Sequence, residues 1–110
     1  MTIKSYVLTF SVPASTSWAR YATLTTPAGI TRTVREIRLH FSATSGVQLR
    51  FYWETEYLSG IVAEVWNKYP IPYSADWAIP AGTSLHVEAA NSTASAATVI
   101  IEIIVEEARA

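Results

Sequence analysis

The sequence predicts an all-β protein: one antiparallel β-sandwich of seven to eight strands, with a jelly-roll or immunoglobulin-like arrangement. Apolar and polar residues alternate with a period of two through most of the chain, which is the side-chain repeat of a β-strand. Turn signals rich in Pro, Gly and small residues separate the alternating segments, and no segment carries the period of a long helix. The 110 residues suffice for one core but not for two, so residues 1–110 are expected to form a single domain.

The first half of the chain contains four alternating segments. They are Lys4–Val12, Trp18–Leu24, Thr33–Ser42 and Val47–Glu56. In the third segment, Ile37, Leu39 and Phe41 are expected to face the core, while the charged and polar residues between them face outward. In the fourth segment, the inward side chains are those of Val47, Leu49, Phe51 and Trp53. The turn signal between the third and fourth segments predicts that they pair as a hairpin.

The second half of the chain is less regular until its last thirty or so residues. Gly60–Trp66 fits a short strand or one helical turn equally well. Asn67–Asp76 carries Pro70 and Pro72, which predicts an extended loop. From Ile79 to Glu107 two alternating arms are expected to form a hairpin, and one face of the second arm is entirely apolar. That face comprises Ala97, Val99, Ile101, Ile103 and Val105.

The start of this C-terminal segment also carries a resemblance. Ile79-Pro80-Ala81-Gly82-Thr83-Ser84-Leu85-His86-Val87, followed by Ala90-Asn91 and a long apolar strand, resembles the end of small jelly-roll domains. Such domains occur in viral capsid and appendage proteins and in sugar-binding modules. The resemblance implies a fold class and carries no catalytic residues over to this chain.

Composition narrows the function classes. The net charge of −1 argues against binding to nucleic acid, and no apolar run is long enough for insertion into a membrane. The first ten residues alternate instead of forming the apolar run of a signal peptide, so the localisation stays open, with a virion or an extracellular surface favoured. Hydrophobic residues make up 50% of the chain and charged residues 15%, more apolar surface than so small a domain can hide. Some of that surface is therefore expected to meet a partner.

Aromatic residues gather in the middle of the sequence and give the candidate contact surface. Its members are Tyr52, Tyr57, Trp66, Tyr69, Tyr73 and Trp77. Tyr and Trp combine a large apolar body with a polar tip, which suits a platform for sugar rings or a protein partner. The alternative interpretation, that these rings only cap one end of the sandwich, is equally consistent with the sequence.

Signals for catalysis are weak. His40 and His86 could share a metal only if their strands were neighbours, and Glu54, Glu56 and Glu64 could do acid–base work only if they converged. There is no cysteine. Two further patterns are interpreted as ordinary features: the Arg32, Arg35 and Arg38 cluster as surface charge, and Asn91-Ser92-Thr93 as a chance glycosylation sequon. We therefore expect no catalytic residues, no metal site, no cofactor and no enzyme.

These observations favour a non-enzymatic structural protein that assembles with copies of itself, in a virion shell, as a decoration protein or in a surface appendage. The alternative is a carbohydrate-binding module that uses its loop aromatics. For the N-terminal strand, pairing within its own sandwich is favoured over exchange into a neighbour.

Overall fold

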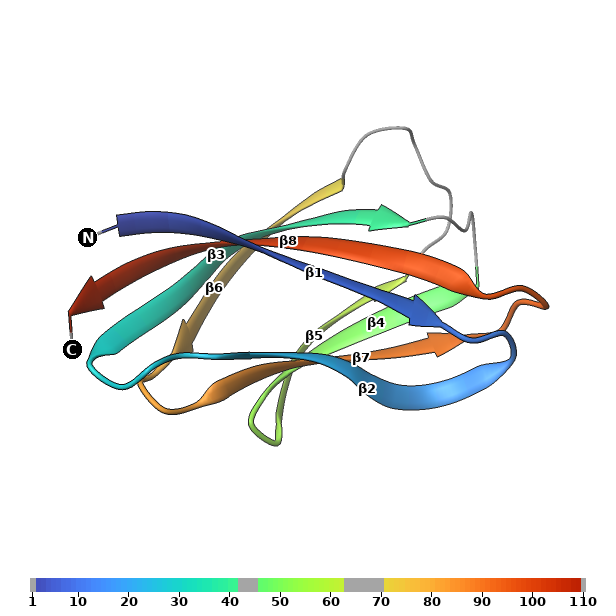
Figure 1. Ribbon diagram of the computed structural model, residues 1–110, viewed down its shortest axis with the longest axis horizontal. Helices are drawn as coiled ribbons and strands as arrows, with labels where there is room; N and C mark the ends of the chain where they lie inside the picture. Colours follow the sequence, from blue (N-terminus) through green and yellow to red (C-terminus); the bar gives the residue numbers. More distant parts are fainter. Residues whose placement is uncertain (1, 42–45, 63–70, 110) are drawn as a thin grey trace.

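The computed structural model describes residues 2–41, 46–62 and 71–109, and these form two packed antiparallel sheets of four strands each (Figure 1). The strands are β1 (Thr2–Val12), β2 (Thr16–Thr25), β3 (Ile30–Phe41), β4 (Val47–Trp53), β5 (Glu56–Val62), β6 (Ile71–Ile79), β7 (Ser84–Asn91) and β8 (Ala97–Arg109). One sheet has the order β1-β8-β3-β6 and the other has the order β2-β7-β4-β5. No helix that could cross a membrane occurs in these three ranges.

The strand order distinguishes between the two predicted arrangements. Among the described strands, β4 and β5 are the one consecutive pair that lies side by side in a sheet, and every other step along the chain moves from one sheet to the other. Eight strands wound in this way form a jelly roll. In Figure 1 the two layers run roughly along the same axis, and both ends of the chain lie at the same end of the sandwich. The all-β sandwich prediction is confirmed, and its jelly-roll form is the one observed.

Both predicted hairpins are wrong. The arms of the C-terminal segment are β7 and β8, which belong to opposite sheets, and the same holds for β3 and β4. Strand β8 instead lies between β1 and β3, while β4 pairs with β5 and β7. Alternation states which side chains face the core but does not name the neighbouring strand, so strands from facing sheets and strands of one hairpin look alike in sequence.

Two strand boundaries also differ from prediction. The predicted strand Val47–Glu56 is broken after Trp53, because Glu54 adopts the left-handed backbone conformation (φ 53°) in the tight β4–β5 turn. The predicted loop Asn67–Asp76 belongs to strand β6 from Ile71 onward. Within β6, Pro72 pairs with Arg38 of β3. Strand β6 is the edge of its sheet, where a residue without a backbone N–H is tolerated. Residues 63–70, which include part of the two middle segments, lie outside the described ranges.

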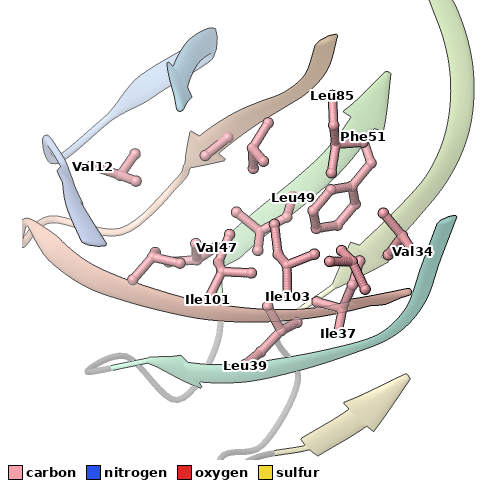
Figure 2. Packing of buried hydrophobic residues seen from close by; sticks show 14 of the residues in the cluster. Val12, Val34, Ile37, Leu39, Val47, Leu49, Phe51, Leu85, Ile101 and Ile103 are labelled. Atoms are coloured by element: carbon pink, nitrogen blue, oxygen red, sulfur yellow. The ribbon is translucent and has the colours of Figure 1, made fainter. Parts of the chain in front are cut away.

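The core lies between the two sheets, and Figure 2 shows labelled side chains from both layers pointing into it. The inward faces predicted for β4 and β8 are confirmed: Leu49, Phe51, Ile101 and Ile103 are fully buried, and Trp53 packs against them. Ile37 and Leu39 are buried as expected, whereas the side chain of Phe41 is outside what the structure describes. Strand β1 pairs with β8 of the same chain along its whole length, which is the arrangement that the sequence analysis favoured for the N-terminal strand.

A β-bulge in β3 overturns the interpretation of Arg32 as surface charge. The pairing register of β3 with β8 shifts between Val34 and Glu36, so Arg35 is one extra residue. Inward positions are therefore even-numbered before the bulge and odd-numbered after it, which turns Arg32 into the sandwich and places both Arg35 and Arg38 outside. Arg32 is only 3% exposed, and it meets Glu107, which is 5% exposed.

These two residues anchor a buried polar network at the end of the sandwich where the termini lie. Arg32 Nε donates to Glu107 Oε2 at 2.8 Å, and Arg32 also donates to the Thr25 carbonyl at 3.1 Å. Tyr6 donates its hydroxyl proton to Glu107 Oε2 at 2.8 Å and lies under the guanidinium, 4.5 Å from ring centre to Cζ. Lys4 Nζ lies 3.2 Å from Glu107 Oε1. The network joins β1, β3 and β8.

Asn91, the first residue of the apparent sequon, is a structural residue. It is 1% exposed, and its side-chain amide donates to the carbonyls of Val12 (3.2 Å) and Ser95 (2.9 Å). Its Oδ1 accepts from the Thr93 backbone N–H at 2.9 Å and from the Thr93 hydroxyl at 2.6 Å. Asn91 thus ties the end of β1 to the loop between β7 and β8.

Candidate contact surfaces

The structure separates the aromatic residues of the predicted contact surface. Tyr52 on β4 and Tyr57 on β5 lie on the outer face of the β2-β7-β4-β5 sheet, with their rings edge to face at 5.7 Å. Tyr73 and Trp77 lie on the inward side of β6 and pack against the core, where Trp77 is 5.5 Å from the Phe51 ring. Trp66 and Tyr69 lie outside the described residues. A continuous surface of all the described members is therefore not formed.

Two residues that the sequence analysis did not assign complete the surface around Tyr52 and Tyr57. Trp18 of β2 is 36% exposed, and the Arg50 guanidinium lies over its ring, 4.1 Å from the centroid. The same guanidinium is 5.5 Å from the Tyr52 ring. We call Trp18, Arg50, Tyr52 and Tyr57 the aromatic face.

Local backbone geometry places these four side chains together. In β4, Arg50 and Tyr52 alternate with the buried Leu49 and Phe51, so they point outward as the alternation predicts. Trp18 lies where β2 carries one extra residue relative to β7, between Thr16 and Ala19. Bulges redirect side chains, so a regular alternation could not have assigned the direction of Trp18.

The charges under the aromatic face are balanced. Arg50 Nε and Nη2 each lie 2.8 Å from Glu88 Oε1 on β7, and Arg20 of β2 lies 3.9 Å from the other carboxylate oxygen. His86, the next outward residue on β7, shares a 2.9 Å hydrogen bond between its Nδ1 and the Thr23 hydroxyl. Burial and the nearby Arg20 lower the pKa of His86, against the opposing effect of Glu54 and Glu88. His86 is therefore mostly neutral at pH 7.

A shallow depression of about 260 Å³ lies in this face. Its lining comes from three strand segments and comprises Trp18, Gln48, Leu49, Arg50, Tyr57 and Gly60. Gly60 contributes to this shape, because a Cβ added there would lie 2.8 Å from the Tyr57 hydroxyl oxygen and the Tyr57 side chain would have to shift. Tyr57 itself is 58% exposed.

The outer face of the other sheet is divided into a charged part and an apolar part. Over β3, β6 and β8 the charged side chains pair with each other: Arg35 with Asp76 and Glu106, and Arg38 with Glu36 and Glu102.

Along β1 and β8 the same face carries exposed apolar side chains, interspersed with serine, threonine and glutamate. Ile3 and Val7 of β1 are 70% and 60% exposed, and Ile100 of β8 is also exposed. In the register of the two strands, Ser5 lies opposite Ile104 and Thr9 opposite Ile100, so Val7 is the diagonal neighbour of both isoleucines. We call Ile3, Val7, Ile100 and Ile104 the apolar strip.

The two histidines considered for a metal site do not come together. His40 lies on the outer face of the β1-β8-β3-β6 sheet and His86 on the outer face of the other sheet, so they point away from each other across the sandwich. Glu54 lies in the β4–β5 turn, where its Oε1 accepts from the Ser84 backbone N–H at 2.7 Å. Glu56 follows the turn, and Glu64 is outside the described residues. Within the described ranges no group of three or more His, Cys, Asp or Glu side chains could hold a metal.

Comparisons with known proteins agree with this architecture. The sequence matches no protein-family model and none of the curated proteins. Solved structures with a similar fold include the crystal structure of PirA, with a TM-score of 0.56 at 13% identity over 89% of this chain and 93% of that chain. The acidic stable capsid structure of Helicobacter pylori bacteriophage KHP30 gives a TM-score of 0.54 at 16% identity, over 96% and 94% of the two chains. The structure of Bacillus endospore appendages gives a TM-score of 0.49 at 16% identity, over 98% of this chain and 88% of that chain. At these identities the similarity is one of fold, and the chain has a β-sandwich fold that is also found in a phage capsid.

Proposed function

We propose that this protein is a non-enzymatic structural subunit that assembles with copies of itself through the edge strand β1 and the apolar strip, in a virion shell or a surface appendage. The observation that carries the proposal is the apolar strip, because Ile3 and Val7 expose most of their side chains beside an unpaired sheet edge. Similarity in fold to a phage capsid protein supports this setting.

The β1 edge lacks the usual protection against pairing. Soluble proteins commonly block edge strands with charges, prolines, bulges or short length. Strand β1 is 11 residues long, contains no proline and pairs with β8 without a register shift. Lys4 is its single charged residue, and its ammonium group is paired with Glu107. The edge is therefore suited to pairing with another chain.

The rest of the sheet supports the same location for a partner. Arg35 and Arg38 are paired with carboxylates of their own chain, so this part of the face offers few free charges.

Light scattering coupled to size exclusion tests the proposal. Replacing Ile3 and Val7 together by Lys places charges on the strip, and each Lys would lie opposite a glutamate of β8, Glu106 and Glu102, so folding should be retained. Wild type is expected to form an oligomer and the double variant a folded monomer. The matched control is Ser74→Lys, which adds charge to the exposed side of β6 and should assemble like wild type. A monomeric wild type, or a double variant that assembles as wild type does, contradicts the proposal.

A further inference from the structure

We propose that the aromatic face is a binding site for one ring of a neutral glycan, held in the depression between Trp18 and Tyr57. This site lies on the sheet opposite the apolar strip, so it does not depend on self-assembly.

The size of the depression suits a single sugar ring. Its volume of about 260 Å³ lies just under the usual range of pockets for drug-sized ligands, about 300–1,000 Å³. Because Gly60 has no side chain, the hydroxyl end of Tyr57 can lie directly over it and form one wall of the depression. A pyranose ring within a longer chain would enter such an open depression from solvent and leave its neighbouring rings outside.

The chemistry of the lining also fits a sugar. One face of a pyranose presents C–H groups, which pack against the electron-rich face of an indole or phenol ring. Trp18 and Tyr57 are the two aromatic side chains among the described residues that line the depression, and Arg50 covers one face of the Trp18 ring. The hydroxyl groups at the edge of a sugar need hydrogen-bonding partners, and the Gln48 amide, the Tyr57 hydroxyl and the Arg50 guanidinium supply both donors and acceptors.

Charge balance points to a neutral ligand. Among the described residues that line the depression, Arg50 is the one ionisable cation, and two of its nitrogens are 2.8 Å from Glu88. An anionic ligand would have to compete with that carboxylate, which also attracts Arg20. A neutral polyol can accept from the guanidinium without separating the ion pair.

The rings of the aromatic face already have contacts within the protein. Glu88 holds Arg50, Arg50 lies over Trp18, and Tyr52 contacts Tyr57 edge to face. Rings that are already held in place lose little conformational entropy on binding, which favours even a small ligand.

Titration followed by ¹H–¹⁵N NMR tests the site. The probes are cellohexaose, xylohexaose, mannohexaose, maltohexaose and chitohexaose at millimolar concentration, with a decaproline peptide as a competing class of ligand. The Trp18 indole N–H signal, assigned by its loss in Trp18→Ala, should shift saturably with at least one oligosaccharide. Trp18→Ala and Tyr57→Ala, followed through backbone amides of β4, should each weaken that binding about tenfold or more.

Gly60→Ala distinguishes shape from chemistry. The added methyl group displaces the hydroxyl end of Tyr57 without removing any polar group of the site, so binding should fall while the melting temperature stays near that of wild type. Ile3→Ser, on the other sheet, should leave binding unchanged. Each of four results would overturn the proposal: no shift with any oligosaccharide, equal binding by Trp18→Ala, a shift with decaproline alone, or an indole shift that depends on protein concentration and so reveals a second copy on this face.

Discussion

Replacing Glu107 by Gln should strongly destabilise the fold, although glutamine is close to glutamate in size. The carboxylate lies in the interior and receives hydrogen bonds from Arg32 and Tyr6 and an ion pair from Lys4. In the variant, the guanidinium of Arg32 stays buried at 3% exposure without a counter-charge. Burying an unpaired charge is among the most costly changes in a protein interior.

The magnitude follows from the contacts that are lost. Breaking a buried ion pair by removing one partner costs about 3–5 kcal/mol, whereas the exposed Lys4 contributes at most about 1 kcal/mol. The glutamine carbonyl still accepts hydrogen bonds, so we expect about 3 kcal/mol, equivalent to roughly 10–20 °C in melting temperature for a domain of this size. Arg32→Met should cost a similar amount, since it leaves the carboxylate without its main partner.

The double variant Arg32→Met/Glu107→Gln decides whether charge is the cause. It leaves neither charge in the interior, so its loss should be smaller than the sum of the single losses by at least about 2 kcal/mol. Urea unfolding at pH 7, followed by tryptophan fluorescence, gives the free energy of unfolding of wild type, the two single variants and the double variant. A loss below about 1 kcal/mol in Glu107→Gln, or strictly additive losses in the double variant, would refute the reasoning.

The pH dependence of stability tests the role of the Glu107 carboxyl independently. Burial raises the pKa of the Glu107 carboxyl, but the hydrogen bonds from Arg32, Tyr6 and Lys4 outweigh burial, so the pKa lies below its ordinary value of about 4.5. The unfolded chain therefore takes up this proton first, and the stabilisation is present above about pH 4.5 and is lost as the pH falls through the lower, folded-state pKa. The stability difference between wild type and Glu107→Gln should narrow below that pH, and a constant difference would contradict the assignment.

Two further substitutions test the core and the loop anchor. Ile101→Ala removes a fully buried side chain between the sheets and should cost about 2–5 kcal/mol in urea unfolding, whereas an unchanged melting temperature would mean that β8 does not face the core in this register. Asn91→Ala leaves the Val12 and Ser95 carbonyls without their amide donor and should cost about 1–3 kcal/mol, while Ser92→Ala at the neighbouring exposed position should cost much less. Equal effects of the last two would exclude an anchoring role for Asn91.

The sequence by itself determines the direction of most side chains. Along β4 and β8 successive side chains point to opposite faces of the sheet. The burial of Leu49, Phe51, Ile101 and Ile103 therefore follows from alternation alone. The outward position of Arg50 and Tyr52, and with it half of the aromatic face, follows in the same way.

Pairing was decided only by the tertiary structure. Nothing in the residues of β7 and β8 states that they pass into opposite sheets, because an inward-facing side chain packs equally well from either layer. The turn at Glu54 was missed for a different reason: it contains no glycine, proline or asparagine, and the Ser84 backbone holds the strained residue from another strand. Contacts between residues distant in sequence leave no local signal.

The bulges have the largest functional consequence. One extra residue at Arg35 exchanges the two faces of β3, which buries Arg32 against Glu107, and one extra residue near Trp18 changes the local register of β2 beside the aromatic face. A sequence pattern with a period of two continues unchanged until a residue is inserted, and only the hydrogen bonding to neighbouring strands shows where that insertion lies. The sequence therefore determined which residues form strands and which way regular stretches face, whereas the tertiary structure determined which strands meet and which polar and aromatic residues share a surface.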